Sequence, residues 1–365
     1  MNPEFHSLDN TLFERAVTLL DEEWLTHDVD LGPVVPTVLA RNVGQDWHKA
    51  GTFRHHLQGV ARTLTLWQQP VHVRMLGLLH SVYGNAYVDL VKFDPASERA
   101  RVRELIGEEA ERLVHLFCTM SRTRFVQAVL QGGMAADGSL LLQGDGQAQR
   151  LAPEEVAAFT VLTMADTAEQ WYSWQDDIFS RYPDHRNTLA APVHWAASLW
   201  PGPMRPTSRM VTQAAQLGAA LRHPALEGLL PMPPVFDQCR NLLTPRDEAA
   251  ALSLYWSVIQ QDQPLVDADA ATAVLEQAVA LNPWVGEPQI VLAQLYLTVG
   301  EFERAEAAAA SGLQMLACWG TSWDKRIGWD AWLAWGRILL QGAQTRNWPE
   351  RLDKLNNLAL RAASH

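Results

Sequence analysis

Hydrophobic residues in the first half of the chain recur every three or four positions. The stripe is clearest over residues 52–67 and continues in the shorter, more apolar run 71–82. Side chains at this spacing share one face of a helix, so both segments are predicted to be helical with that face buried. Further helices are predicted on the same grounds over residues 6–25, 98–106, 108–120, 153–174 and about 207–221.

Glycine interrupts this pattern between residues 132 and 150. The short apolar piece 140–142 is followed by Asp145 and Gly146, a pair that is typical of tight turns. A small hairpin or a loop is therefore expected here, within a chain whose fold class is predicted to be all-α.

A proline-rich zone extends from Pro183 to Pro206. Proline has no backbone N–H and breaks helices, so this zone predicts a boundary near residue 190. The sequence thus predicts two helical domains in series, residues 1–190 and 191–365, and a chain of 365 residues is long enough for both.

The second predicted domain contains an internal repeat. Ala271 and Ala278 recur 34 residues later as Ala305 and Gly312. A period of this length, with small residues where paired helices touch, resembles the tetratricopeptide repeat. The resemblance is clearest over residues 250–317, and it implies a protein partner bound in a concave groove.

Tryptophan is concentrated at the end of the chain. The chain has 15 tryptophans, and six of them lie in its last 47 residues: Trp319, Trp323, Trp329, Trp332, Trp335 and Trp348. Such large side chains either pack in a core or form a contact surface. The alternatives are that they line the repeat groove or that most of them belong to its core, and the core interpretation is favoured.

The charge balance excludes some classes of partner. The chain has 41 acidic and 29 basic side chains, a formal net charge of −12. Nucleic-acid binders and proteins that bind anionic membranes depend on basic patches, so neither partner is expected. The sequence contains no run of about 18 apolar residues, so no membrane-spanning segment is predicted. The three cysteines lie far apart, which argues against a disulfide framework and favours a cytoplasmic location.

Two histidines and one aspartate stand in apolar helical contexts of the first domain. They are His56, His80 and Asp166. Two imidazoles and one carboxylate form a ligand set that suits a divalent Mn, Fe or Zn ion and leaves coordination positions open for water. The alternative is a polar core in which these three groups only bond to one another.

The order and context of these residues resemble the HD-domain superfamily over about residues 45–180. Members of that superfamily are all-helical and bind one or two divalent metals through His, His-Asp and Asp. The resemblance implies His56, His80 and Asp166 as metal ligands. It also implies the hydrolysis of phosphate esters or, in a minority of members, a di-iron oxygenase reaction.

The chain departs from the superfamily at Ser81, where the His-Asp doublet has its aspartate. Serine is a neutral and poor ligand, so a single ion bound more weakly is expected. The sequence is most similar to a group of HD-like proteins with the string H-S-V-Y-G (here 80–84). This group shares two further segments, Ile-Gly-Glu-x-Ala-Glu (106–111) and Ala-Asp-x-x-Glu-Gln (165–170). That group implies no particular reaction.

Further side chains are candidates for catalytic work. Glu169 and Gln170 follow Asp166 on the same helical face and are suited to orient a ligand or a water. Tyr83 either bonds to a substrate or fills the core. Three basic residues are expected to hold an anion: Lys92, Arg122 and Arg124. The alternative is that they form surface ion pairs with Glu108, Glu109 or Glu111. Asp89, which follows the H-S-V-Y-G string, is a further candidate near the site.

Three functions are compatible with this sequence. The first is a metal-dependent hydrolase that acts on a phosphorylated small molecule. The second is an iron oxygenase on the same scaffold, and the third is a non-catalytic protein that binds a partner through its repeats. Ser81 favours the third function, whereas the joint presence of His56, His80 and Asp166 favours an enzyme. The hydrolase is the leading hypothesis.

Overall fold

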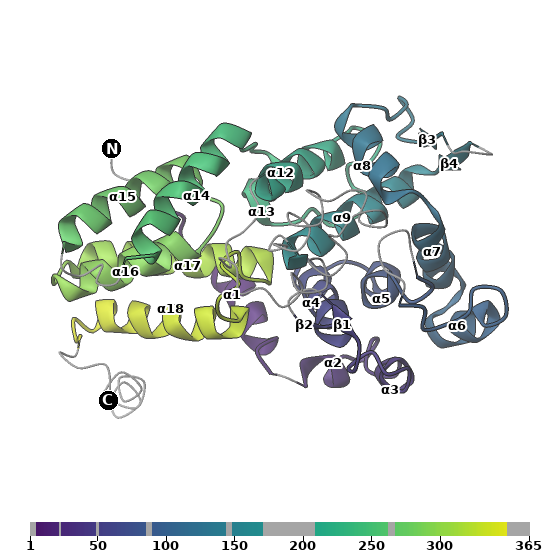
Figure 1. The fold of residues 1–365 in the computed structure, drawn as a ribbon, viewed down its shortest axis with the longest axis horizontal. Helices are drawn as coiled ribbons and strands as arrows, with labels where there is room; N and C mark the ends of the chain where they lie inside the picture. The colour runs from purple at the N-terminus through teal and green to yellow at the C-terminus, as the bar shows by residue number, and fades with distance from the viewer. Residues whose placement is uncertain are drawn as a thin grey trace, which may run out of the picture. The chain divides into compact units, whose positions relative to one another are not determined.

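The fold is almost entirely helical (Figure 1). The computed structural model describes residues 5–21, 23–48, 51–84, 90–143, 148–170, 209–261 and 267–348. Within these ranges the strands form two short antiparallel hairpins, β1 (Trp47–His48) with β2 (Gly51–Thr52) and β3 (Leu140–Leu142) with β4 (Gln149–Leu151). The predicted all-α class is confirmed. In the described part of the chain, every helix is too short or too polar to cross a membrane.

The chain forms two compact units, and each is assembled from separate segments. The first, which we call the site unit, comprises residues 18–173 and 213–242 as far as they are described. The second, the repeat unit, comprises the described parts of residues 1–17, 174–212 and 243–365. The predicted domain boundary near residue 190 lies outside the described residues.

The helices of the site unit match the apolar stripes of the sequence in most places. They are α2 (Trp24–His27), α3 (Val35–Leu39), α4 (Phe53–Leu66), α5 (Val71–Leu79), α6 (Arg99–Ile106), α7 (Glu108–Thr119), α8 (Arg122–Leu130), α9 (Pro153–Gln170) and α13 (Val235–Cys239), and α12 (Met210–Leu221) continues from one unit into the other. The single helix predicted over residues 6–25 is wrong. It is replaced by α1 (Asn10–Thr18) and the separate α2, with a turn between them. The last predicted residues of the helix over 153–174 lie outside the described part of the chain.

Helices α4, α5 and α9 pack against one another in the site unit. Helix α4 begins where Thr52 Oγ1 accepts a hydrogen bond from the His55 backbone N–H at 3.3 Å, an N-cap that satisfies one of the helix's free donors. Gly77 on α5 faces α4, and a Cβ at this position would collide with Leu64 Cδ1. The absence of a side chain at Gly77 therefore sets how closely α5 approaches α4.

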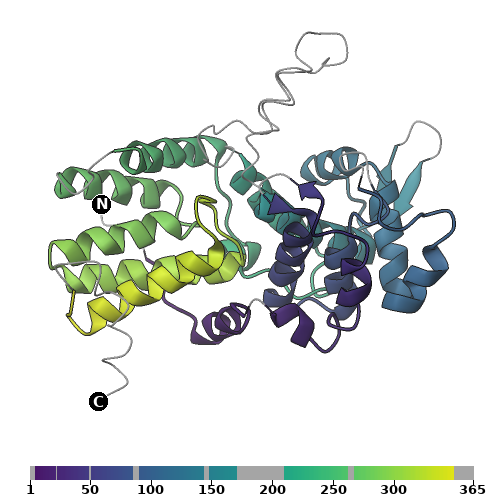
Figure 2. The same cartoon turned by 60° about the horizontal axis from the view of Figure 1, so that its bottom comes forward.

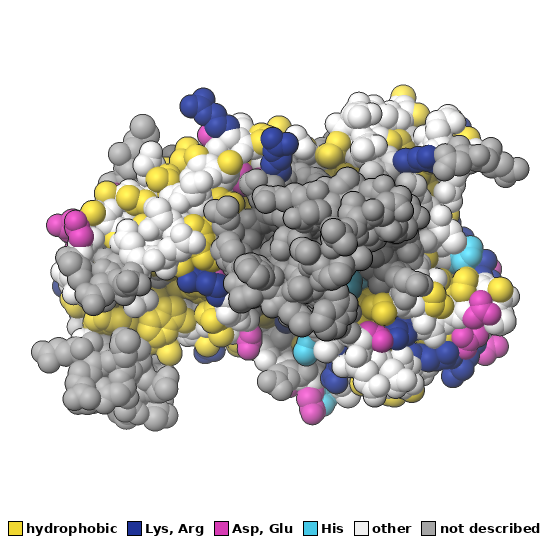
Figure 3. All heavy atoms as spheres, viewed as in Figure 1, with side chains coloured by type: hydrophobic (Ala, Val, Ile, Leu, Met, Phe, Trp, Pro, Cys, Tyr) yellow, Lys and Arg dark blue, Asp and Glu magenta, His cyan; other side chains and the backbone are white. Residues whose placement is uncertain are grey.

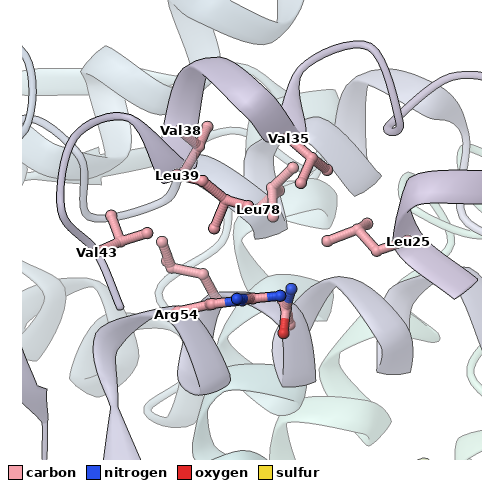
Figure 4. Close-up of a pocket in the computed structure, with 9 residues that line it drawn as sticks. Leu25, Val35, Val38, Leu39, Val43, Arg54 and Leu78 are labelled. Carbon is pink, nitrogen blue, oxygen red and sulfur yellow. The ribbon is translucent and has the colours of Figure 1, made fainter. Parts of the chain in front are cut away.

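An apolar hollow lies beside these helices (Figure 4). Its lining is aliphatic apart from Arg54 and Gln58, and it consists otherwise of Leu25, Val35, Val38, Leu39, Val43, Leu57 and Leu78. The Arg54 side chain lies across the hollow from Val35 and Val38. None of the site residues predicted from the sequence lines this hollow, so it is separate from the candidate metal centre.

Charged side chains of both signs alternate over α6 and the start of α7. Arg101 is exposed and lies 3.6 Å from Glu98, and Arg103 extends toward Glu111. Glu108 and Glu109 are exposed in the first turn of α7. Blue and magenta side chains accordingly lie close together on this part of the surface in Figure 3. The charged residues here therefore form no patch of a single sign.

The repeat unit is built from helices that pack on their neighbours in the chain. They are α14 (Pro245–Ile259), α15 (Ala268–Leu281), α16 (Glu287–Thr298), α17 (Phe302–Trp319) and α18 (Trp329–Gln344). Helices α16, α17 and α18 lie side by side in both views (Figures 1 and 2). Gly312 lies at a helix contact, since a Cβ there would stand 2.6 Å from Ile290 Cδ1. This is the role that the repeat pattern predicts for a small residue.

The tryptophans near the end of the repeat unit belong to its core. Trp319, Trp323, Trp329 and Trp332 are each no more than 5% exposed. The indole N–H groups of Trp319, Trp329 and Trp332 each donate to a backbone carbonyl oxygen. The accepting residues are Trp284, Leu316 and Asp324, respectively. Buried indoles need such partners, so the core interpretation of these residues is confirmed.

The first residues of the chain also belong to the repeat unit. The backbone N–H of His6 donates to Ser311 Oγ at 2.9 Å, and that of Asp9 donates to Gln314 Oε1 at 2.8 Å. These contacts join positions 305 residues apart in the chain. Sequence patterns gave no sign of this arrangement, because they report only on neighbours along the chain.

Candidate metal centre

Three ligand atoms converge in the core of the site unit. His56 Nε2 lies 3.1 Å from His80 Nε2 and 3.3 Å from Asp166 Oδ1, and His80 Nε2 lies 3.6 Å from the same oxygen. Ligands that stand about 2.0–2.2 Å from a shared ion, at octahedral or tetrahedral angles, are about 2.9–3.6 Å from one another. The spacing of these atoms therefore suits a single ion, and all three residues are buried.

Each ligand comes from a different element of the packed group α4, α5 and α9. His56 lies on the buried face of α4, and His80 directly follows the last residue of α5. Asp166 lies on α9, which is buried along most of its length. The apolar stripes that drive these helices together thus carry the three polar groups into one place.

Hydrogen bonds to the other ring nitrogen fix the orientation of both imidazoles. His80 Nδ1 donates to the Gly77 carbonyl oxygen at 2.8 Å, because a carbonyl can only accept. His56 Nδ1 donates to Glu169 Oε2 at 2.5 Å. Both Nε2 atoms therefore face Asp166 Oδ1. An outer carboxylate or carbonyl of this kind is the usual partner of a metal-binding histidine.

His80 has the neutral charge state that a metal-binding histidine needs. Burial lowers the pKa of His80 well below its usual value, and electrostatic interactions with His56 and Arg122 lower this pKa further. The hydrogen bond to Gly77 acts in the opposite direction but does not outweigh burial. His80 is therefore neutral at pH 7, and neutral imidazole is the form that binds metals.

Arg122 holds the second oxygen of Asp166. Its guanidinium pairs with Asp166 Oδ2 and lies 4.9 Å above the ring of Phe117. The pairing orients the carboxylate so that Oδ1 faces the imidazoles. Without a metal ion, an N–H at His56 Nε2 can instead donate to His80 Nε2 and Asp166 Oδ1. This arrangement is the polar-core alternative.

The structure places the other predicted residues as follows. The Tyr83 hydroxyl is buried and donates to Glu111 Oε1 at 3.0 Å. Arg124 donates to the Gln143 carbonyl oxygen at 3.1 Å. Neither bond reaches one of the three ligands, so substrate contact by Tyr83 or Arg124 stays a prediction. Lys92 pairs with Asp46 rather than with the glutamates of α7, and Asp89 lies outside the described residues.

Two residues near the ligands carried no clear signal in the sequence. The ring centroid of His48 lies 4.6 Å from that of His56, and His48 reaches this position from hairpin β1–β2, which was not predicted. Gly59 lies one turn after His56, and a Cβ at this position would stand 2.9 Å from Glu169 Cγ. The missing side chain of Gly59 therefore gives Glu169 the space it needs to reach His56.

Comparison with known proteins identifies part of the repeat unit. Residues 267–315 match the tetratricopeptide repeat. Residues 37–122 match a domain of unknown function, DUF6817, which includes His56, His80 and Arg122 but ends before Asp166. No curated protein and no solved structure matches the chain. The matches therefore support the repeat, and they bring no support for the HD-domain superfamily.

Gly59→Ala is expected to weaken metal binding about tenfold. The added methyl group displaces Glu169, and loss of an outer partner typically costs about 10–100-fold in metal affinity. Titration with Co²⁺ measures the change. Gly44→Ala is the control, because its Cβ would meet Arg54 Cδ at an ordinary 3.8 Å. Equal affinities of the two variants would show that the close approach at Gly59 has no role.

Proposed function

We propose that the site unit binds one divalent transition-metal ion through His56, His80 and Asp166 and uses it to hydrolyse a phosphorylated small molecule. The observation that carries this proposal is the fixed orientation of both imidazoles, whose Nε2 atoms face one carboxylate oxygen. Three protein ligands leave coordination positions for water and substrate, as in known catalytic sites.

The surrounding residues have defined tasks in this proposal. An ion held by His56, His80 and Asp166 would supply an activated water and would polarise the phosphoryl group. Glu169 accepts a hydrogen bond from His56 Nδ1–H, which fixes the ring and increases the basicity of the imidazole. Arg122 orients Asp166, and its forked guanidinium matches the geometry of phosphate oxygens. The resemblance to the HD-domain superfamily points to the same reaction class.

A second candidate is an iron-dependent oxygenase. Two histidines and one carboxylate on one side of an ion form the ligand set of many non-haem Fe(II) oxygenases. The distances among His56, His80 and Asp166 are compatible with that arrangement. The repeat match over residues 267–315 supports a role in binding a protein partner, whichever reaction the site unit performs.

Metal analysis of the full-length protein tests the proposal. Protein purified without chelator is expected to hold about one ion per chain. His80→Gln should lose it, whereas the control His55→Gln should keep it, because His55 is exposed on the same helix as His56. Manganese or zinc together with phosphatase activity supports the hydrolase, and iron together with oxygen consumption supports the oxygenase. Absence of a bound ion, with no uptake on titration, would refute the proposal.

A further inference from the structure

The turn that follows α5 carries His80 and is tied to α7. The carbonyl oxygen of His80 accepts a hydrogen bond from Cys118 Sγ at 3.2 Å. The ring of His80 meets that of Phe117 edge-on, with the two centroids 6.2 Å apart. In the same turn, the Tyr83 hydroxyl donates to Glu111 Oε1 at 3.0 Å. Glu111 and Cys118 lie about two turns apart in α7, so one face of this helix holds both ends of the turn.

Glu111 is an acceptor whose own position is fixed. It is 1% exposed, and Arg99 donates to it from Nε at 2.7 Å and from Nη2 at 3.0 Å. The guanidinium of Arg103 lies 3.6 Å from its Oε2. A carboxylate held by two parallel bonds from one arginine has a defined direction. The Tyr83 hydroxyl therefore bonds to an oxygen that other contacts already hold in place.

Two strings of the sequence that implied no particular reaction meet at this bond. Tyr83 belongs to H-S-V-Y-G, which begins with His80, and Glu111 ends the string Ile-Gly-Glu-x-Ala-Glu. The turn between His80 and Tyr83 is tight, because the Gly84 backbone N–H donates to the Ser81 carbonyl oxygen at 3.0 Å. A displacement of Tyr83 is therefore passed on to His80, three residues before it.

We infer that Tyr83 and Glu111 are positioning residues of the metal centre. Glu111 holds Tyr83, Tyr83 holds the turn, and the turn keeps His80 Nε2 directed at Asp166 Oδ1. The inference rests on the proposed function and adds to it two residues that do not touch the ion. Loss of a residue that orients a metal ligand typically costs about 10–100-fold in affinity. The lower end is expected here, because Tyr83 acts on His80 through the backbone.

Tyr83→Phe tests this role in the full-length, chelator-treated protein, since it removes the hydroxyl and keeps the ring. Co²⁺ titration should show binding about tenfold weaker than in the wild type. The visible absorption of the bound Co²⁺ should also change, because it depends on the geometry of the ligands. Tyr296→Phe is the matched control in the repeat unit, where Tyr296 donates to Glu276 and Glu276 pairs with Arg304. It should lower the stability in urea and leave the affinity and spectrum of Co²⁺ unchanged.

A double-variant cycle tests whether Glu111 acts through Tyr83. Glu111→Met removes the acceptor and should weaken Co²⁺ binding to a similar extent. Tyr83→Phe/Glu111→Met should then bind Co²⁺ no more weakly than the weaker of the two single variants, because both substitutions remove the same contact.

The outcomes separate the positioning role from the metal site itself. If Tyr83→Phe has the Co²⁺ affinity and spectrum of the wild type, the positioning role is overturned and the metal site stays in place. Additive losses in the double variant overturn the inference that Glu111 acts through Tyr83. Absence of Co²⁺ binding in the wild type overturns the proposed function and this inference together. If Glu111→Met fails to fold, the comparison of Tyr83→Phe with Tyr296→Phe still decides the role of Tyr83.

Discussion

Asp166→Asn is expected to destabilise the metal-free protein by about 2–3 kcal/mol and to abolish metal binding. Asp166 is 4% exposed, and its carboxylate is the partner of Arg122. Removing one member of a buried ion pair takes a counter-charge away from the other, which typically costs about 3–5 kcal/mol. The lower figure is expected here because the side chain of Arg122 is 17% exposed and keeps some contact with water.

Unfolding in urea, with chelator and with Mn²⁺ or Zn²⁺, measures both effects. The wild type should gain stability when metal is added, and Asp166→Asn should not. Asp137→Asn is the control, since Asp137 pairs with Arg150 at an exposed site and such pairs contribute about 0–1 kcal/mol. An Asp166→Asn protein that is as stable as the control and is still stabilised by metal would contradict the assigned role of Asp166.

The double variant Arg122→Gln/Asp166→Asn is expected to recover part of the lost stability. It also removes Arg122, which pairs with Asp166 in the wild type, so the two substitutions should not be additive. It should not recover metal binding, because the carboxylate ligand is still missing. Additive losses of stability would show that Arg122 and Asp166 do not act as a pair.

Glu287→Gln is expected to stabilise the repeat unit by about 3 kcal/mol above pH 8. Glu287 is 1% exposed, and its Oε1 accepts hydrogen bonds from the backbone N–H groups of Trp323 at 2.5 Å and Asp324 at 3.2 Å. Burial, followed by the negative charge of Asp324, raises the pKa of Glu287 from 4.5 to about 7. Glutamine keeps the accepting oxygen and has no charge to bury.

The pH dependence has a definite sign. A carboxyl group whose pKa is raised by folding favours the folded state below its unfolded pKa of 4.5, and this stability is lost as the pH rises through about 7. The advantage of Glu287→Gln should therefore be small at pH 4 and grow between pH 4.5 and 7. A shift of this size corresponds to about 3 kcal/mol at full ionisation.

Urea unfolding of the wild type and Glu287→Gln from pH 4 to pH 9 measures this advantage. Tryptophan fluorescence is a suitable signal, because Trp319, Trp323, Trp329 and Trp332 lie in the core of the repeat unit. Glu303→Gln, at an exposed position of α17, is the control. If the stabilities of the wild type and Glu287→Gln stay parallel across this range, the ionisation of Glu287 does not affect folding.

The helical character of the chain and the location of its repeat follow from the amino-acid sequence alone. The apolar spacing over residues 52–67 corresponds to α4, and the small residues Ala271 and Ala305 lie in α15 and α17 of the repeat. Gly107 ends α6 with a φ of 85°, a conformation that glycine adopts without strain. These features depend on residues close together in the chain, and a sequence pattern reports on such neighbours directly.

The apolar helical contexts of His56, His80 and Asp166 also indicated the three candidate ligands. The structure brings them together, and their role as metal ligands stays a prediction. Their partners were only partly visible beforehand. Gln170 was expected to orient a ligand, but a direct bond to Asp166 Oδ1 appears only when the side chains are placed.

How these groups meet depends on the packing of helices that are far apart in the chain. Glu169 reaches His56 across 113 residues because α9 packs against α4 at Gly59, and Arg122 reaches Asp166 from the start of α8. The His6 segment joins the repeat unit in the same way, over 305 residues. Helical periodicity fixes which face of each helix is buried. It does not fix which helices meet or at what depth, and hydrogen-bond partners depend on both.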